Sequence, residues 1–410
     1  MSPASKTIMS KDRYSQKAYS YINTLCTVKP NRRTGSVGNR AATEFFAQNI
    51  QRWGYEIDTT PFLCLDYRSG ICILKCGDAN YEVFISPYSR SCRKTAILVT
   101  ASTVEELEAV NCTDKILLMR GELCAEQLMP KNFVFYNPEH HKHIYALLES
   151  KRPVAIVTAT SGKPELVGAL YPFPLIEDGD FNIPSMYCTD VTGNIIARKT
   201  GQIFELTARG KRIASTASNV IATKNLEASH KIIICAHIDA YGNSPGALDN
   251  ASGTTVLLLL AEMLKNRRIE TGLEIIAFNG EDNYSAGGQM DYLRRYGQDL
   301  NKVSLTVNID DVAYLHGQTA FSMYGCLDAL QKKVRAIFGE YSSLTEGTEW
   351  YQGDHMIFVQ KGIPAIALTS DRVAELMSNI THTDKDTADK VDCRKLVEMA
   401  EALRDLVIRL

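Results

Sequence analysis

The chain has 410 residues, of which 45% are hydrophobic and 22% are charged, and its formal net charge is −2. This composition is that of a folded protein with a full hydrophobic core, so it argues against a disordered chain, a fibre or a disulfide mini-protein. The near-neutral charge also argues against a nucleic-acid-binding protein, which would need an excess of Lys and Arg to displace counterions from phosphates.

Eleven cysteines are scattered along the chain without a CxxC pair. This distribution is typical of reduced thiols rather than of a disulfide framework. The sequence MSPASKTIMSKDRYSQK at the start has no apolar stretch like that of a signal peptide. The longest apolar run, Val256 to Leu260, is too short to span a bilayer. We therefore expect a cytoplasmic protein that does not enter a membrane.

The first half of the chain predicts two helices followed by a β-rich region. Apolar and aromatic residues recur at helical spacing from Arg13 to Cys26 and again from Asn39 to Trp53. From about residue 60 to residue 215, short apolar or alternating segments, among them Ile71–Leu74 and Phe204–Leu206, are separated by turns, with one helix near His143–Lys151. Within this region, the run Glu139–His143 could bind a metal ion, but we interpret it as an exposed, solvated turn.

The second half of the chain, from Ser218 onward, alternates strand-like and helical segments. The strands are expected at Lys231–Ala236, Leu273–Phe278, Leu305–Ile309 and Ala365–Leu368, and the helices at Ala251–Lys265, Gly287–Tyr296, Leu327–Phe338 and from Cys393 to the end. This alternation predicts an α/β fold, with a mixed, largely parallel sheet flanked by helices on both faces. The early helices are expected to pack on the same sheet. Residues 1–60 and 215–410 then form one discontinuous domain, and residues 61–214 form an insertion.

Ionisable residues collect where three of the predicted strands end. His237 and Asp239 follow the first of these strands, Glu281-Asp282 follow the second, and Asp310 follows the third. Ligands in open α/β sheets gather at the carboxyl ends of the strands. We therefore expect these side chains to meet at one edge of the sheet.

Two further candidates lie in loops that precede predicted helices, namely Asp249 and His382. A single His or Asp in such a place is most often structural. Several carboxylates at one edge, however, repel one another and lose hydration at a high cost unless a cation neutralises them. A pair of divalent ions would do so, and the mixture of imidazole nitrogen and carboxylate oxygen suits zinc.

Several segments of the chain resemble the co-catalytic di-zinc aminopeptidase superfamily, which also contains glutamate carboxypeptidase, transferrin receptor and glutaminyl cyclase. These segments are His237-Ile238-Asp239, Ala247-Leu248-Asp249-Asn250-Ala251-Ser252-Gly253, Phe278-Asn279-Gly280-Glu281-Asp282, Asn308-Ile309-Asp310 and Thr381-His382-Thr383-Asp384. The resemblance extends to Arg33–Ser36 and to Gly353–Ala365, so it covers about residues 10–60 and 215–410. The inserted residues 61–214 resemble a protease-associated domain.

The resemblance implies a set of five metal ligands. His237 and Asp310 would bind one zinc ion, Asp282 and His382 would bind the other, and Asp249 would bridge the two. The relatives usually carry Glu where this chain has Asp282. Because Asp is one methylene shorter, the second ion would lie closer to its strand, and Co²⁺ or Mn²⁺ remains an alternative to Zn²⁺ there.

The resemblance also implies catalytic residues. Glu281 would be the general base that takes a proton from a metal-bridging water. Asp239 would accept a hydrogen bond from His237 and fix the orientation of its ring. Tyr351 and His355 are weaker candidates for contacts with the substrate.

The resemblance implies a metal-dependent exopeptidase, most directly a di-zinc aminopeptidase acting on the N-terminal residues of peptides. A carboxypeptidase and a glutaminyl-cyclase-like enzyme remain alternatives. A scaffold of the transferrin-receptor type, which binds a partner without catalysis, is the alternative from another class. Peptides are the expected partners, nucleic acid and membranes are not, and a homo-oligomer remains open.

Overall fold

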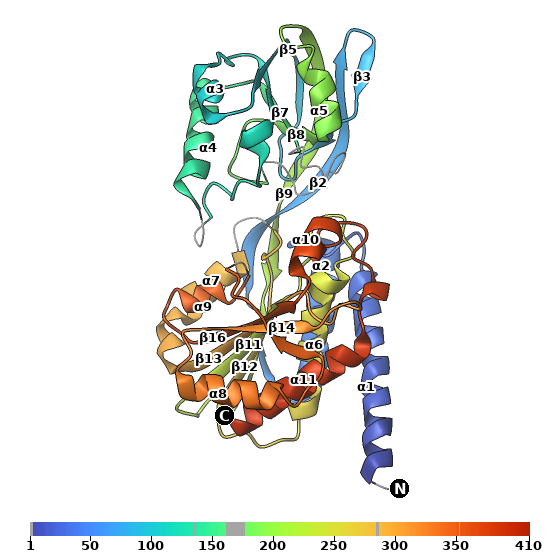
Figure 1. Cartoon of the computed structure of the whole chain (residues 1–410), viewed down its shortest axis with the longest axis vertical. Coiled ribbons are helices and arrows are strands. Elements are labelled where there is room, and N and C mark those ends of the chain that lie inside the picture. The colour runs from blue at the N-terminus through green and yellow to red at the C-terminus, as the bar shows by residue number, and fades with distance from the viewer. Residues whose placement is uncertain (1–2, 134–136, 161–176, 284–286, 352) are drawn as a thin grey trace. The chain divides into compact units, whose positions relative to one another are not determined.

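The computed structural model describes the chain except for residues 1–2, 134–136, 161–176, 284–286 and 352, and it describes side chains from residue 12 onward. The chain divides into two compact units (Figure 1). Unit 1 consists of Met1–Cys64 and Ser215–Leu410, and unit 2 consists of Leu65–Ala214.

Unit 1 contains one mixed sheet and most of the helices. Its helices are α1 (Pro3–Cys26), α2 (Val37–Arg52), α6 (Gly253–Leu264), α7 (Gly287–Tyr296), α8 (Asp328–Phe338), α9 (Met356–Val359), α10 (Val373–Asn379) and α11 (Cys393–Arg409), with short turns at Ala247–Ser252, Gly297–Lys302 and Ala388–Lys390. Its strands are β1 (Glu56–Asp58), β10 (Val220–Lys224), β11 (Lys231–His237), β12 (Gly272–Phe278), β13 (Val303–Ile309), β14 (Thr319–Tyr324), β15 (Leu344–Glu346) and β16 (Ala365–Ser370). The strand order is β1-β10-β12-β11-β13-β16-β14-β15.

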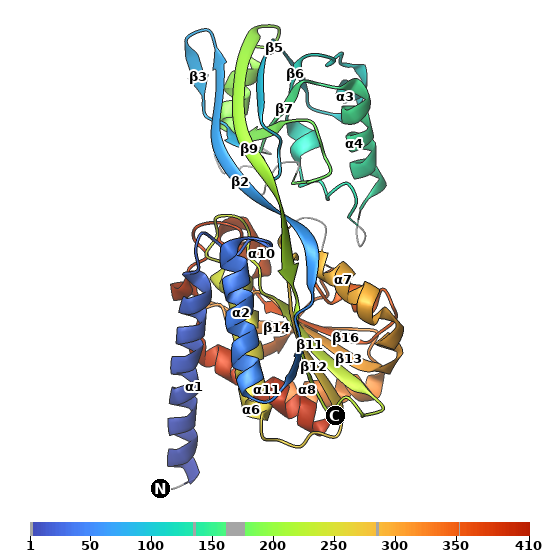
Figure 2. The same ribbon diagram turned by 180° about the vertical axis from the view of Figure 1, so that it is seen from behind.

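The centre of this sheet is parallel and buried on both faces. Strands β12, β11, β13 and β16 run in one direction, whereas β10 and β14 pair antiparallel on either side of them. The central strands are almost continuous apolar runs, as expected for strands that are covered on both sides. Helices α1, α2, α6 and α11 cover one face, and α7 and α9 lie on the other (Figures 1 and 2).

Unit 2 is built on a second sheet with the order β3-β2-β9-β5-β6-β7-β8-β4. Its strands are β2 (Pro61–Cys76), β3 (Ala79–Tyr81), β4 (Phe84–Ile85), β5 (Cys92–Ala101), β6 (Ile116–Met119), β7 (Ala155–Ala159), β8 (Ser185–Cys188) and β9 (Ile203–Ser218), and its helices are α3 (Val104–Ala109), α4 (Glu139–Lys151) and α5 (Asp190–Ala197), with a short turn at Gly121–Cys124. The start of β2 and the end of β9 belong to unit 1. Alternate residues of β6 enter two different cores. Ile116 packs with α5, and Leu117 packs with α3 and α4.

The predicted α/β class is confirmed, and so are the four central strands predicted in the second half of the chain. The short segments expected at Ile71–Leu74 and Phe204–Leu206 are parts of two strands of 16 residues each, β2 and β9. Polar residues and Gly70 interrupt the alternation in β2, so the sequence pattern fragments a strand that is continuous in the structure.

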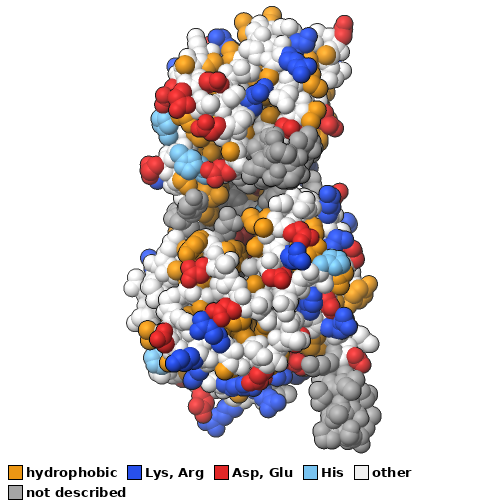
Figure 3. Space-filling view, in the orientation of Figure 1, with side chains coloured by type: hydrophobic (Ala, Val, Ile, Leu, Met, Phe, Trp, Pro, Cys, Tyr) orange, Lys and Arg blue, Asp and Glu red, His pale blue; other side chains and the backbone are white. Residues whose placement is uncertain are grey.

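Helix α4 begins at Glu139, earlier than the helix predicted near His143, so the exposed turn expected over residues 139–143 is wrong. His141 points inward from its first turn and is buried. None of the described helices is long and apolar enough to cross a bilayer. Lys and Arg side chains are interspersed with Asp and Glu over the visible face (Figure 3).

Candidate metal centre

Three parallel strands of unit 1 deliver polar side chains to a common edge. Strand β11 lies between β12 and β13, with His237 level with Phe278 and Cys235 level with Asn308. The carboxyl ends of the three strands are therefore aligned. Gly280, the second residue after β12, has a φ of +93°, which turns the chain sharply and places Glu281 and Asp282 at this edge.

The first cluster at this edge consists of His237, Asp249 and Asp310. The Nε2 atom of His237 lies 3.2 Å from Asp249 Oδ1 and 3.3 Å from Asp310 Oδ1. All three side chains are nearly inaccessible to solvent. The three ligand atoms thus converge on one point from β11, from the loop before α6 and from β13.

The second cluster consists of Asp249, Asp282 and His382. The Nε2 atom of His382 lies 3.0 Å from Asp249 Oδ2 and 2.8 Å from Asp282 Oδ1. Asp249 therefore directs one carboxylate oxygen to each cluster, which is the arrangement of a bridging ligand. The ring of Tyr241 stacks on His382 with 4.8 Å between the ring centroids.

The donor set of the two clusters fits zinc. Two ligands that bind one tetrahedral zinc ion at about 2.0–2.2 Å lie about 3.3 Å apart, close to the separations found here. The second carboxylate oxygen of Asp282 is buried and has no hydrogen-bond partner among the described residues. Described Lys and Arg side chains form no ion pair with the carboxylates of either cluster, which pair with His237 and His382 instead. The chemistry of these residues therefore fits a bound divalent cation.

Asp239 lies behind His237 and links it to neighbouring segments. Its Oδ1 atom is 3.6 Å from His237 Nδ1, longer than a hydrogen bond but directed at the ring. Its Oδ2 atom accepts hydrogen bonds from Asn283 Nδ2 at 2.7 Å and from Thr34 Oγ1 at 3.0 Å. The backbone N–H of Glu281 also points to Asp239 Oδ1, at 3.4 Å. Asp239 therefore ties the His237 strand to the turn that carries Glu281.

The pKa values of Glu281 and Asp282 are raised because these acids are buried close to other carboxylates. Burial raises the pKa of Glu281 well above its usual range, and the nearby carboxylates of Asp310 and Asp282 raise it further. Burial and the Asp249 carboxylate raise the pKa of Asp282 to about 6. Bound divalent cations would oppose these shifts, because a positive charge stabilises the ionised carboxylates.

The two predicted substrate residues lie in different environments. Tyr351 is 63% exposed, and its hydroxyl donates a hydrogen bond to Glu349. His355 is completely buried, with Nε2 3.0 Å from the carbonyl oxygen of Trp350. Burial lowers the pKa of His355 to about 4. A role in substrate binding stays a prediction for both residues.

Several residues of this centre were not among the sequence-based candidates. They are Arg32, Thr34, Asn283, Asp354 and Asp386, all of them buried. Asp354 accepts a hydrogen bond from Gln289, and burial raises its pKa to about 7. Arg32 and Asp386 hold the loop that carries Asp249. The sequence could have pointed to these five residues, because each lies in, or within about five residues of, a motif quoted above.

A third group of possible ligands lies in unit 2, formed by Glu126, His140 and His141. His141 Nδ1 accepts a hydrogen bond from the backbone N–H of Met129 at 3.1 Å, so the ring proton of neutral His141 resides on Nε2. This Nε2 faces Glu126 Oε1 at 3.1 Å as a donor. A metal ion would need the lone pair of the same nitrogen, so we interpret this group as a hydrogen-bonded cluster.

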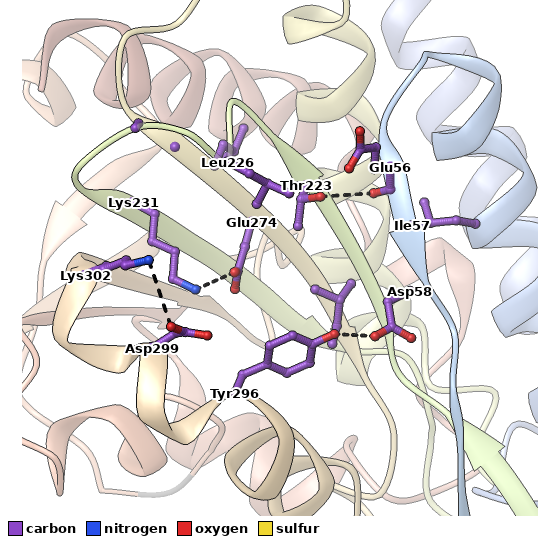
Figure 4. Close-up of a pocket in the computed structure, with 14 residues that line it drawn as sticks. Glu56, Ile57, Asp58, Thr223, Leu226, Lys231, Glu274, Tyr296, Asp299 and Lys302 are labelled. Carbon is purple, nitrogen blue, oxygen red and sulfur yellow. Dashed lines mark hydrogen bonds and ion pairs between the residues drawn. The ribbon is translucent and has the colours of Figure 1, made fainter.

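A cavity of about 310 Å³ lies near the amino ends of β11 and β12, away from the metal centre (Figure 4). Two of its acidic side chains, Glu274 and Asp58, have partners of their own. Glu274 pairs with Lys231 at 2.5 Å and accepts a hydrogen bond from Tyr292 at 2.8 Å. Asp58 pairs with Arg295 and accepts a hydrogen bond from Tyr296. The charges of these two residues are thus neutralised by the protein itself.

Comparison with known protein families gives a match within unit 1. Residues 219–407, which carry all of the candidate ligands, match the family model described as Peptidase family M28. Among curated proteins, the chain is 24% identical over 243 residues to "Aminopeptidase YwaD" of Bacillus subtilis, an alignment that covers 56% of the chain and 51% of that protein. The chain spans about half the length, or less, of the curated relatives that it matches.

Solved structures extend the likeness to nearly the whole length of the chain. The aminopeptidase from Aneurinibacillus sp. strain AM-1 superposes with a TM-score of 0.73 at 23% identity, covering 96% of this chain and 93% of that one. BSAP, a zinc aminopeptidase from Bacillus subtilis, gives a TM-score of 0.74 at 20% identity, with 96% and 95% covered. At these identities the likeness establishes a shared fold.

Proposed function

We propose that this chain is a zinc-dependent aminopeptidase that binds two metal ions and releases N-terminal residues from peptides. The observation that carries the proposal is the pair of His/Asp clusters that share Asp249, with Glu281 directly beside Asp282. The match of residues 219–407 to Peptidase family M28 supports the hydrolytic chemistry. The likeness to zinc aminopeptidases supports the choice of metal and of substrate end.

Each residue has a distinct task in the proposed reaction. His237, Asp249 and Asp310 would hold one zinc ion, and Asp249, Asp282 and His382 would hold the other. When bound, the zinc ions supply Lewis-acid activation of water and of the scissile carbonyl.

Proton transfer is the task of Glu281. Its carboxylate accepts a proton from the attacking water and delivers it to the leaving amine. Asp239 keeps the His237 ring in place and, through the backbone N–H of Glu281, keeps the base near it.

The charge of the centre favours the amino end of a peptide over its carboxyl end. Besides the proposed ligands and Glu281, the carboxylates of Asp311 and Asp354 lie within electrostatic range of the centre, and such groups attract the α-ammonium group of a substrate. A carboxypeptidase needs a cationic side chain for the terminal carboxylate of its substrate. The buried Arg32 is not available for that task, because its guanidinium donates to four backbone carbonyl groups.

The first test combines metal analysis with activity on aminoacyl-arylamides. The protein saturated with zinc should contain two ions per chain and hydrolyse these substrates. Glu281→Gln should bind both ions and lose about 10²- to 10⁴-fold in kcat, the range for loss of a general base. Glu270→Gln is the matched control, because Glu270 is exposed and distant in sequence from every candidate ligand.

The second test separates the two ends of the substrate. Hydrolysis of a short peptide should survive amidation of its C-terminus and stop when its N-terminus is acetylated. The opposite pattern would replace the aminopeptidase assignment by a carboxypeptidase. A protein that takes up no zinc, cobalt or manganese would overturn the proposal as a whole.

A further inference from the structure

The carboxylate of Asp386 is completely buried beneath the loop that carries Asp249. Its Oδ1 atom accepts a hydrogen bond from the backbone N–H of Leu248 at 2.7 Å. Its Oδ2 atom accepts another from the backbone N–H of Asp249 at 3.1 Å. The backbone carbonyl of Asp386 accepts a third, from Ala247 at 3.2 Å. Three consecutive N–H groups of this loop therefore end on a single residue.

Arg32 holds the same loop from the other direction. Its guanidinium donates to the carbonyl oxygens of Pro245 and Gly246, both at 2.7 Å. It also donates to the carbonyl oxygens of Leu25 at 2.9 Å and Ile238 at 3.0 Å. The loop is thus fastened both to helix α1 and to the segment that follows His237.

Gly246 makes this fastening sterically feasible. A Cβ atom at this position would lie 2.4 Å from the carbonyl oxygen of Asp249 and 2.7 Å from the Arg32 guanidinium. Its φ of +62° is also a conformation that favours glycine. Gly246 therefore allows the loop, Arg32 and the backbone of Asp249 to pack closely, which a residue with a side chain would prevent.

We propose that Asp386 and Arg32 are positioning residues that place the Asp249 carboxylate between the two metal ions. The inference rests on the proposed two-metal function. It explains why the two carboxylate oxygens of Asp249 face the two clusters. A carboxylate can bridge two ions only when both of its oxygens are aimed correctly. Its backbone must therefore be fixed, and the hydrogen bonds to Asp386 and Arg32 fix it.

The position of Asp386 distinguishes support of Asp249 from a local effect on His382. Asp386 lies four residues after His382, a ligand of the second cluster only. A disturbance confined to this segment would weaken the second ion and spare the first, whose ligands are His237, Asp249 and Asp310. Loss of the support under Asp249 would weaken both ions.

The test measures the dissociation constants of both ions by chelator competition, using Asp386→Asn in the full chain. The Asn side chain accepts at one atom only, and its NH₂ group would face the second backbone N–H. We expect both constants to rise by about 10- to 100-fold, the range for residues that support metal ligands. The absorption spectrum of the Co²⁺-substituted variant should change as well. Asp384→Asn is the matched control, because Asp384 is exposed on the same segment.

A second variant, Arg32→Lys, keeps the positive charge but removes the planar fork that reaches several carbonyl oxygens. We expect the same weakening of both ions, although Arg32 belongs to a different segment. If Asp386→Asn does not fold, as judged by circular dichroism, the Arg32→Lys result decides. Metal constants within twofold of the wild type in a folded Asp386→Asn protein would overturn the inference, and so would loss of the second ion alone. Failure of the wild type to bind two ions would instead overturn the proposed function.

Discussion

Unit 1 brings acidic side chains together in two places, at the carboxyl ends of its parallel strands and around the cavity that contains Glu274. At the carboxyl ends, Asp249, Asp282 and Asp310 face two histidines and no described Lys or Arg. Around the cavity, Glu274 pairs with Lys231, and Asp58 accepts a hydrogen bond from Tyr296 (Figure 4). Arg295 also pairs with Asp58, and Tyr292 donates a hydrogen bond to Glu274. The side chains of Asp282 and Glu274 are both buried but, of the two, only Glu274 pairs with a Lys or Arg among the described residues.

The difference shows that a crowd of carboxylates is not by itself a metal site. Burying an acid is costly, and a protein can meet that cost with an ion pair, with hydrogen bonds or with a bound cation. Around the cavity, Lys231 and Arg295 already meet it, so a cation would have to compete with them. At the carboxyl ends the proposed zinc ions would meet it, with His237 and His382 as candidate nitrogen ligands.

Removal of the bridging carboxylate should have the largest effect. Asp249→Asn should weaken each of the two zinc ions by more than about 100-fold, because the residue takes part in both clusters and an amide is a poor bridging ligand. His382→Ala should weaken mainly the second ion. The measurement is chelator competition combined with metal analysis of the protein after dialysis. Equal loss of both ions from His382→Ala would contradict the assignment of ligands.

Removal of a cation near the amino ends should affect stability and leave the metals alone. Lys231→Met leaves the buried Glu274 carboxylate without its ion-pair partner, so we expect the free energy of unfolding to fall by about 3 kcal/mol. Both zinc constants should stay within twofold of the wild type. Urea denaturation and chelator competition measure the two quantities.

The matched control for this pair is Lys302→Met. Lys302 is 58% exposed and lies 4.0 Å from Asp299, so its loss should change the free energy of unfolding by less than about 0.5 kcal/mol. Zinc binding that weakens in Lys231→Met would remove the contrast between the two ends of the sheet.

The smallest expected effect concerns the pH dependence of stability. Burial lowers the pKa of His355 to about 4, whereas the unfolded chain takes up that proton near the ordinary value of about 6.5. Between these values the unfolded state binds more protons, so this residue makes stability fall as the pH decreases. From about pH 7.5 to about pH 5 the loss should amount to about 2 kcal/mol.

The measurement is the difference between the wild type and His355→Gln in urea denaturation at several pH values. The variant should lose less stability than the wild type as the pH falls, because glutamine does not titrate. The exposed His316→Gln is the control, and it should follow the wild type. A variant that follows the wild type in the same way would show that the buried ring contributes nothing to the pH response.

The interior of unit 1 was largely predictable from the sequence. The runs Ile232–Cys235 and Leu273–Phe278 are apolar except for Glu274. Such continuous apolar runs predict parallel strands that are buried on both faces. The long strands β2 and β9 were not predictable in their full length, because their faces alternate between exposed and half-buried positions and dilute the pattern. Helix α4 was predicted too short, since its first turn is rich in histidine.

The sequence by itself determined which residues end the central strands. The geometry of a parallel sheet then places His237, Glu281-Asp282 and Asp310 at one edge, since all of the strands point the same way. Only the tertiary structure decided which acids have partners. Glu274 lies within β12 and Asp282 follows the same strand, yet one meets Lys231 and the other meets His382. Such pairings join segments that are far apart in the chain. They result from tertiary packing, which the local hydrophobic periodicity of a sequence does not predict.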